Sequence, residues 1–205
     1  NIGISMNLQL VNIISSLNPS IKSINRFMDT TRSFTVIGFP ILIENNICYV
    51  SVNHSLYWNN DNIKIKFPHI KKLFPAKIQK LPYWTDLLIL SFQHSNHFSN
   101  NINKMIKVTK NSFIKTSKKL IPKEGEEMNL VTINDNIIRN YEVKFESIMY
   151  DQFNISDIQQ MYLRFTAEDN SLIKEGISGS PIIKDNKLVG IVSKINKEEK
   201  YIMVI

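Results

Sequence analysis

Hydrophobic and polar residues alternate along most of this chain, in short runs with a period of two. Because successive side chains of a β-strand point to opposite faces, this period predicts strands and not helices. The predicted strands are Ser33–Ile37, Pro40–Glu44, Ile47–Val52, Ile63–Phe67, Ala76–Lys80, Leu87–Phe92, Met128–Ile133, Glu142–Met149, Met161–Phe165, Pro181–Lys184, Leu188–Ile195 and Tyr201–Ile205. Turns rich in Asn and Asp separate them, and many short strands at regular spacing favour a barrel or a sandwich.

Two segments depart from this alternation. The stretch Leu8–Leu17 (LQLVNIISSL) is followed by Asn18-Pro19 and predicts a short helix. Residues 95–117 are polar and rich in Asn and Lys, which is typical of a linker. We therefore expect a helix and a lead-in strand at 1–24, one set of strands at 25–100, a linker at 101–119 and a second set at 120–205.

Composition narrows the class of protein. The 205 residues are 43% hydrophobic and 21% charged, which suits a folded core and excludes a disordered chain. No apolar run approaches the roughly 20 residues of a membrane span. The single cysteine, Cys48, excludes an internal disulfide and favours the cytoplasm, or the cytoplasm of a host cell. Since the chain begins with Asn1 and no basic-then-apolar leader precedes the fold, we expect a fragment, a matured product or an excised domain.

The net charge of +7 gives the chain a basic surface. Such a surface attracts nucleic acid or other anionic partners, but it is also what an ordinary solvated face looks like. No RNA-binding signature or aromatic-interleaved basic run supports nucleic acid as a partner. His94 and His97 have a loosely metal-like spacing without a third ligand nearby, so we expect no metal and no cofactor.

Glu175–Ile183 (EGISGSPII) is the segment that most strongly indicates a catalytic site. A serine between small residues, on a tight turn before an apolar strand, is exposed as a nucleophile must be. Gly176 lets the backbone turn so that its N–H and that of Ser178 can point at one developing oxyanion. The alternative reading is an ordinary Gly/Ser hairpin turn.

A serine nucleophile needs a base, and the base needs an orienting partner. His54 ends an apolar strand and is the candidate base; the alternative is a histidine in a strand-end loop. Asp86 opens the apolar strand that begins in Thr85-Asp86-Leu87-Leu88, where a carboxylate is costly unless it is paired. A strand-capping aspartate is the alternative. The order His, Asp, Ser differs from that of subtilisin-like and α/β-hydrolase enzymes.

With these residues, the chain resembles the chymotrypsin/trypsin-like serine proteases, in the style of HtrA-like and viral members. The resemblance covers about residues 18–205. It rests on the segments Asn18–Ile24, Gly38–Leu42, Tyr49–His54, Ala76–Ile78, Thr85–Leu90, Gly176–Pro181 and Leu188–Ser193. It implies an all-β fold, with two six-stranded antiparallel barrels at 25–100 and 120–205 and the active site between them.

The resemblance also implies roles for individual residues. The triad is His54, Asp86 and Ser178, and the N–H groups of Gly176 and Ser178 form the oxyanion hole. Ser193 hydrogen-bonds the triad aspartate, and Ser193-Lys194-Ile195 pairs with the substrate backbone.

Among the positions that depart from the family, two bear on activation and specificity. Ile177 stands where digestive proteases carry the aspartate that a newly cleaved N-terminus pairs with, so trypsin-type activation is not expected. Ile195 replaces a glycine that keeps the specificity pocket open. That pocket is either acidic or apolar. The first alternative involves Glu199, with Glu168, Asp169, Glu175 and Glu198 nearby, and the second involves Leu172 and Ile195.

The predicted function is that of a serine endopeptidase acting on polypeptides through an acyl-enzyme. A viral polyprotein protease and an HtrA-like protease both fit the pattern. The alternative from another class is a catalytically inactive module of the same fold that binds RNA or a protein partner. The full triad argues against this alternative, because inactive relatives usually lose a triad residue.

Overall fold

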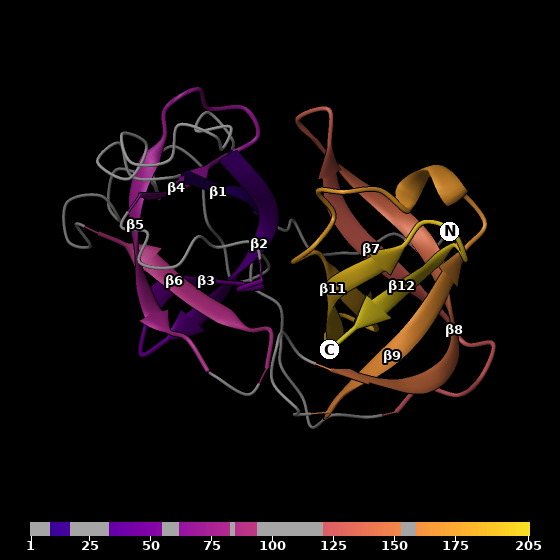
Figure 1. Ribbon diagram of the computed structural model, residues 1–205. Coiled ribbons are helices and arrows are strands. Elements are labelled where there is room, and N and C mark those ends of the chain that lie inside the picture. The colour runs from indigo at the N-terminus through magenta and orange to yellow at the C-terminus, as the bar shows by residue number, and fades with distance from the viewer. Residues whose placement is uncertain (1–8, 17–32, 55–61, 83–84, 94–120, 153–158) are drawn as a thin grey trace, which may run out of the picture.

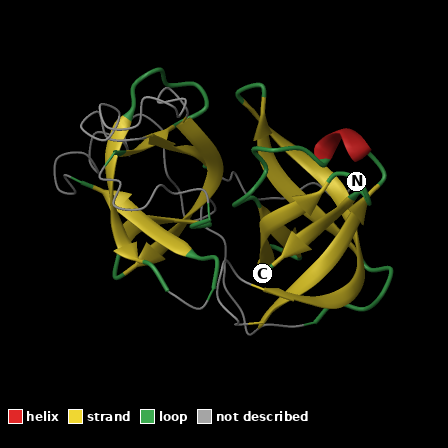
Figure 2. Cartoon of the chain, in the orientation of Figure 1, coloured by secondary structure: helices red, strands yellow, loops and turns green. Residues whose placement is uncertain are grey.

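The computed structural model describes residues 9–16, 33–54, 62–82, 85–93, 121–152 and 159–205. Two closed antiparallel barrels lie side by side (Figures 1 and 2). The first has the strand order β1-β2-β3-β6-β5-β4, and the second has the order β10-β11-β12-β9-β8-β7. The double six-stranded barrel expected from the sequence is therefore confirmed.

The strand bounds follow the predicted runs closely in most places. The first barrel contains β1 (Val11–Ser16), β2 (Ser33–Ile43), β3 (Asn46–Ser51), β4 (Ile63–Lys66), β5 (Phe74–Lys80) and β6 (Leu88–Phe92). The second contains β7 (Glu127–Asn134), β8 (Ile137–Gln152), β9 (Gln159–Ala167), β10 (Pro181–Lys184), β11 (Lys187–Asn196) and β12 (Tyr201–Val204), with a 3₁₀ turn, η2, at Asn170–Leu172.

The helix expected at Leu8–Leu17 is wrong, because this stretch contains strand β1. Its residues are alternately buried and partly exposed, with Val11, Ile13 and Ser15 facing inward. The strand pairs with β2 on one side and β4 on the other, and so closes the first barrel. An isolated helix of this length is marginal in water, whereas two hydrogen-bonded neighbours stabilise a strand.

The domain bounds change accordingly. The first barrel includes β1, so the separate segment expected at 1–24 is wrong. The predicted lead-in strand at 18–24 and the linker at 101–119 lie outside the described residues. The runs predicted as two strands at 33–44 form the single strand β2, whose first half pairs with β1 and whose second half pairs with β3.

The apolar cores of the two barrels meet. Val131, Ile183 and Ile191 belong to the second barrel but pack in the same buried cluster as the interior of the first. A further cluster fills the second barrel. Burial of this apolar interface fixes one barrel against the other, and residues from both barrels can then form one site.

Candidate active site

His54 is held by the backbone that follows β3. The N–H groups of Asn53 and His54 each donate a 2.8 Å hydrogen bond to Oδ1 of Asp86. The Asn53 amide donates in turn to the carbonyls of Thr85 and Leu87, at 3.2 Å each. These bonds tie the end of β3 to the start of β6, so the sequence-predicted pair of His54 and Asp86 is brought together. The part played by Asn53 was not predicted.

Asp86 is fully buried, and its second carboxylate oxygen serves two donors. Oδ2 lies 2.5 Å from Nδ1 of His54 and accepts a 2.6 Å hydrogen bond from the Ser193 hydroxyl. Burial alone would raise the pKa of Asp86, but the hydrogen bond and charge of His54 and the hydrogen bond of Ser193 together lower it. The carboxylate is therefore ionised, which favours a proton on Nδ1 and leaves Nε2 of His54 free to accept one.

The hydrogen bond expected from Ser193 to Asp86 is thus present, and it joins the two barrels. The His54 side chain is 26% exposed, whereas the Asp86 side chain is fully buried. A buried carboxylate and a solvent-facing imidazole are what a base and its orienting partner need, since the base must reach the substrate and its partner must not.

Ser178 lies on a tight turn between η2 and β10. Gly176 and Gly179 have φ values of +98° and +90°, a region that favours glycine. The carbonyl of Ser178 accepts a 2.7 Å hydrogen bond from the N–H of Ile37, and the N–H of Gly179 donates to the carbonyl of Val192 at 2.8 Å. Strand β2 of the first barrel therefore supports the turn, a role of Ile37 that the sequence did not indicate.

The hydroxyl of Ser178 donates to the carbonyl of Ser193 at 3.3 Å. Since Ser193 also binds Asp86, the candidate nucleophile and the pair of His54 and Asp86 share one neighbour. Within the part of the chain that the structure describes, the N–H groups of Gly176 and Ser178 make no hydrogen bond. Ile177 between them is 1% exposed and packs in the core of the second barrel, so an apolar contact fixes this part of the turn.

Strand β11 carries the segment expected to bind substrate. Along Lys194, Ile195 and Asn196 it pairs with β12 on one edge, and a bulge falls at Ser193. Its pairing with β10 ends at Ile191. Val192 still exchanges backbone hydrogen bonds with Gly179 and Ser180. From Ser193 onward no described strand occupies the second edge of β11, which leaves the backbone groups of Lys194 and Ile195 available to an extended chain.

The five acidic residues considered for the specificity pocket are all exposed: Glu168, Asp169, Glu175, Glu198 and Glu199. Glu199 lies in the turn between β11 and β12, and Asp169 caps η2 by accepting from the N–H of Ser171. By contrast, Leu172 is buried and Ile195 packs against the same cluster. The two alternatives for the pocket therefore differ in burial: the acidic residues face solvent, and the apolar ones pack in the core of the second barrel.

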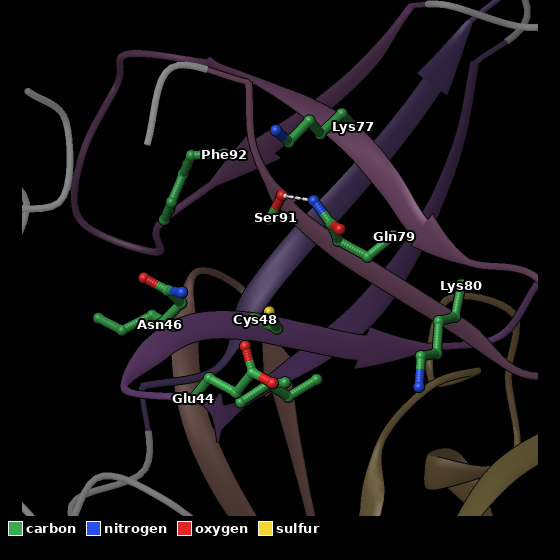
Figure 3. Close-up of a pocket in the computed structure, with 10 residues that line it drawn as sticks. Glu44, Asn46, Cys48, Lys77, Gln79, Lys80, Ser91 and Phe92 are labelled. Atoms are coloured by element: carbon green, nitrogen blue, oxygen red, sulfur yellow. Dashed lines mark hydrogen bonds between the residues drawn. The ribbon is translucent and has the colours of Figure 1, made fainter. Parts of the chain in front are cut away.

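Other features lie apart from this site. A hollow of about 360 Å³ lies beside β3, β5 and β6. Its lining side chains, drawn in Figure 3, are Ile43, Glu44, Asn46, Ile47, Cys48, Lys77, Gln79, Lys80, Ser91 and Phe92. None of these residues belongs to the His54–Asp86–Ser178 group. Among the described residues, no three His, Cys, Asp or Glu side chains are arranged to hold a metal ion. No helix in that part of the chain is long and apolar enough to cross a membrane.

A comparison with protein-family models gives a match over about half of the chain. The family model described as SpoIVB peptidase S55 matches residues 90–201, a range that includes Ser178 but begins after His54 and Asp86. Among curated proteins, none matches the chain significantly.

Two solved structures of one bacterial protease have a similar fold. The active form of the Rv3671c protease from M. tuberculosis has 13% sequence identity and a TM-score of 0.66, over 98% of this chain and 77% of that one. An inactive form of a serine-to-alanine mutant of the same protease has 13% identity and a TM-score of 0.62, over 95% of this chain and 80% of that one.

Proposed function

The chain belongs to the SpoIVB peptidase S55 family of serine proteases, and we propose that it is an endopeptidase with Ser178 as nucleophile, His54 as general base and Asp86 as the orienting carboxylate. The observation that carries this proposal is the buried Asp86 carboxylate, which binds Nδ1 of His54 and the hydroxyl of Ser193 together. The carbonyl of Ser193 also accepts a hydrogen bond from the hydroxyl of Ser178, so Asp86 and Ser178 both bond to Ser193, and His54 is linked to it through Asp86.

The first half of the reaction acylates the enzyme. Rotation about χ1 of Ser178 moves its hydroxyl from the carbonyl of Ser193 toward Nε2 of His54. Nε2 takes the proton while Oγ attacks the scissile carbonyl carbon, and Asp86 stabilises the imidazolium that results. The tetrahedral intermediate collapses when His54 returns the proton to the leaving amine, which departs with the C-terminal half of the substrate.

Water then reverses these roles. His54 removes a proton from a water molecule that attacks the acyl carbonyl, and the same proton returns to Oγ of Ser178 when the new carboxyl group leaves. In both halves the oxyanion needs donors. The N–H groups of Gly176 and Ser178 are supported in this role because neither is used by another described residue.

The substrate is a polypeptide in extended conformation. No described strand occupies the edge of β11 at Ser193, Lys194 and Ile195, and this supports antiparallel pairing with the substrate backbone, since main-chain groups of an edge strand can add one more strand. A peptide bound there runs beside the carbonyl of Ser193, where the hydroxyl of Ser178 already lies. We expect Lys194 to contact the substrate through its backbone, because its ammonium group bonds the carbonyl of Gln152.

A fluorophosphonate probe tests the proposal. Wild-type protein should be labelled at one serine, and labelling should be lost in Ser178→Ala and His54→Ala. Ser171→Ala is the matched control, because Ser171 is an exposed serine on the loop ahead of the nucleophile. It should be labelled like the wild type. Peptide hydrolysis should fall in parallel by several orders of magnitude in the two triad variants. Unchanged labelling of Ser178→Ala would contradict the proposal, and an unlabelled wild type would favour the inactive binding module.

A further inference from the structure

Ser180 is a fully buried serine that the proposed mechanism does not use. It follows Gly179, and its hydroxyl donates a 2.8 Å hydrogen bond to the hydroxyl oxygen of Thr132 on β7, which is also buried. Two hydroxyl groups in an interior are costly unless they are hydrogen-bonded, and small apolar side chains would fill the same space without that requirement. The pair lies two residues from the candidate nucleophile, so its effect on the backbone there is decisive.

The strand register brings these two residues together. Ile182 on β10 lies opposite Leu130 on β7, so Ser180, two residues earlier, comes opposite Thr132, two residues later. The backbone of Ser180 bonds in other directions. Its N–H donates to the carbonyl of Ile177 at 3.0 Å, and its carbonyl accepts from strand β11 at 2.9 Å. The hydrogen bond between the two hydroxyl groups ties Ser180 to β7 as well.

Ser180 closes the turn that carries Ser178. Because its N–H bonds to the carbonyl of Ile177, the four residues 177–180 form one turn, and the φ of +90° at Gly179 fits the third place of a type II turn. The carbonyl of Ile177 and the N–H of Ser178 belong to one planar trans peptide group, in which they point in opposite directions. Holding that carbonyl therefore aims the N–H of Ser178, one of the two proposed oxyanion donors.

Both ends of this turn are anchored in the protein interior. At its first residue, Ile177 is buried in the core of the second barrel. At its last residue, the anchor is Thr132, whose own position is fixed by its neighbours. Val131 and Ile133 pack in the apolar cluster that joins the two barrels, and Thr132 itself pairs with Arg139 of β8. An apolar side chain thus holds one end of the turn, and a hydroxyl pair holds the other.

We propose that Ser180 and Thr132 are positioning residues for the oxyanion hole: their hydrogen bond fixes the end of the turn, and through it the peptide group that carries the N–H of Ser178. The inference rests on the proposed function of Ser178. A donor that is fixed in advance stabilises an oxyanion without reorganisation, and this oxyanion forms in the transition state and not in the bound substrate. Loss of the pair should therefore lower kcat and leave KM nearly unchanged.

The test begins with Ser180→Ala and Thr132→Val, which each remove one hydroxyl group. Each should lower kcat for peptide hydrolysis by about two- to twelve-fold, the range of one neutral hydrogen bond, at a nearly constant KM. Thr132→Ser keeps the hydroxyl and should keep most of the wild-type kcat. Ser91→Ala is the matched control, because Ser91 is also a buried serine with a side-chain partner, Gln79 at 2.6 Å, but lies by the hollow of the first barrel. It should keep the wild-type kcat.

The double variant separates positioning from stability. Each single variant leaves one buried hydroxyl without its partner and should be destabilised. Ser180→Ala combined with Thr132→Val removes both groups, so its loss in urea unfolding should be smaller than the sum of the two single losses. Its kcat should nevertheless stay as low as in the single variants, because the tie between Ser180 and β7 is still missing. A kcat that recovers together with stability overturns the inference.

Equal kcat in Ser180→Ala, Thr132→Val and Ser91→Ala also overturns the inference, while fluorophosphonate labelling of the wild type keeps the proposed function. If Ser180→Ala does not fold, the comparison of Thr132→Val with Thr132→Ser decides. A wild type that is neither labelled nor active contradicts the proposed function, and the inference fails with it.

Discussion

The backbone N–H of Ile37 in the first barrel donates a 2.7 Å hydrogen bond to the carbonyl of Ser178 in the second. The turn that carries the candidate nucleophile is therefore fixed by the barrel that carries His54 and Asp86. The neighbouring glycine explains how the two backbones come so close. A Cβ on Gly179 would lie 1.9 Å from the carbonyl oxygen of Ile37 and 2.7 Å from the hydroxyl of Ser51.

Gly179→Ala should consequently damage both stability and the active site. The new methyl group meets backbone that cannot move aside, and the φ of +90° disfavours any side chain. We expect the free energy of unfolding to fall by more than about 4 kcal/mol, with loss of fluorophosphonate labelling at Ser178. Urea unfolding and the labelling assay measure the two effects.

Gly125→Ala is the control for this prediction. Gly125 also has a positive φ, +81°, but a Cβ there would meet nothing within 4 Å. It should cost only the backbone strain, about 1–2 kcal/mol, and leave labelling intact. Equal losses in the two variants would show that strain alone, and not the contact with Ile37, governs Gly179.

Asp86→Asn should abolish most of the activity without removing the side chain. The amide can still accept from the N–H groups of Asn53 and His54, but its NH₂ would face Nδ1 of His54 and the hydroxyl of Ser193. The imidazole then favours the wrong tautomer. We expect kcat to fall by roughly four orders of magnitude. A variant that keeps a tenth of the wild-type kcat would remove Asp86 from the triad.

The same variant tests the effect of Asp86 on stability. The pKa of Asp86 is lower in the folded protein than its ordinary value of about 3.9. The resulting stabilisation is present above pH ~3.9 and is lost as the pH falls through the lower folded value. The difference in unfolding free energy between wild type and Asp86→Asn should therefore be large at pH 7 and shrink in strong acid. A difference that is constant from pH 7 to pH 3 would contradict this.

The sequence predicted the strands and the pairing of His54 with Asp86 more reliably than it predicted the contacts between the two barrels. Alternation is local, so Leu87–Phe92 and Pro181–Lys184 were found as β6 and β10 within a residue. Leu8–Leu17 failed because two apolar neighbours at Ile13 and Ile14 blur a period of two, and because the pairing with β4 that decides the matter is far away in sequence. For the same reason nothing in the sequence indicated Ile37, whose importance depends on its hydrogen bond to a residue of the other barrel.

Activity should depend on pH through the imidazole of His54. The base must be neutral to take the serine proton, and imidazole ordinarily loses its proton near pH ~6.5, while Asp86 remains ionised well below that. We expect kcat/KM to rise through neutral pH and to hold in mild alkali. A chelator should leave the profile unchanged. A maximum in the acid range would point to a different base, and inhibition by a chelator that added Zn²⁺ reverses would point to a metal.

Substrate preference should follow the apolar wall and not the acidic residues. Ile195 and Ile202 are paired across β11 and β12, so their side chains share one face, and they pack in the cluster that holds the buried Leu172. We expect two branched side chains at this point to admit only a small or medium aliphatic residue before the scissile bond. A peptide library should show cleavage after residues such as Val, Leu or Met.

Ile195→Gly should widen the pocket and raise the relative rate of cleavage after Phe by about ten-fold or more. Glu199→Gln should leave the profile as it is, since Glu199 is exposed in its turn, and the exposed Glu198→Gln is its control. A wild-type preference for Lys or Arg that weakens in Glu199→Gln alone would instead require the acidic pocket.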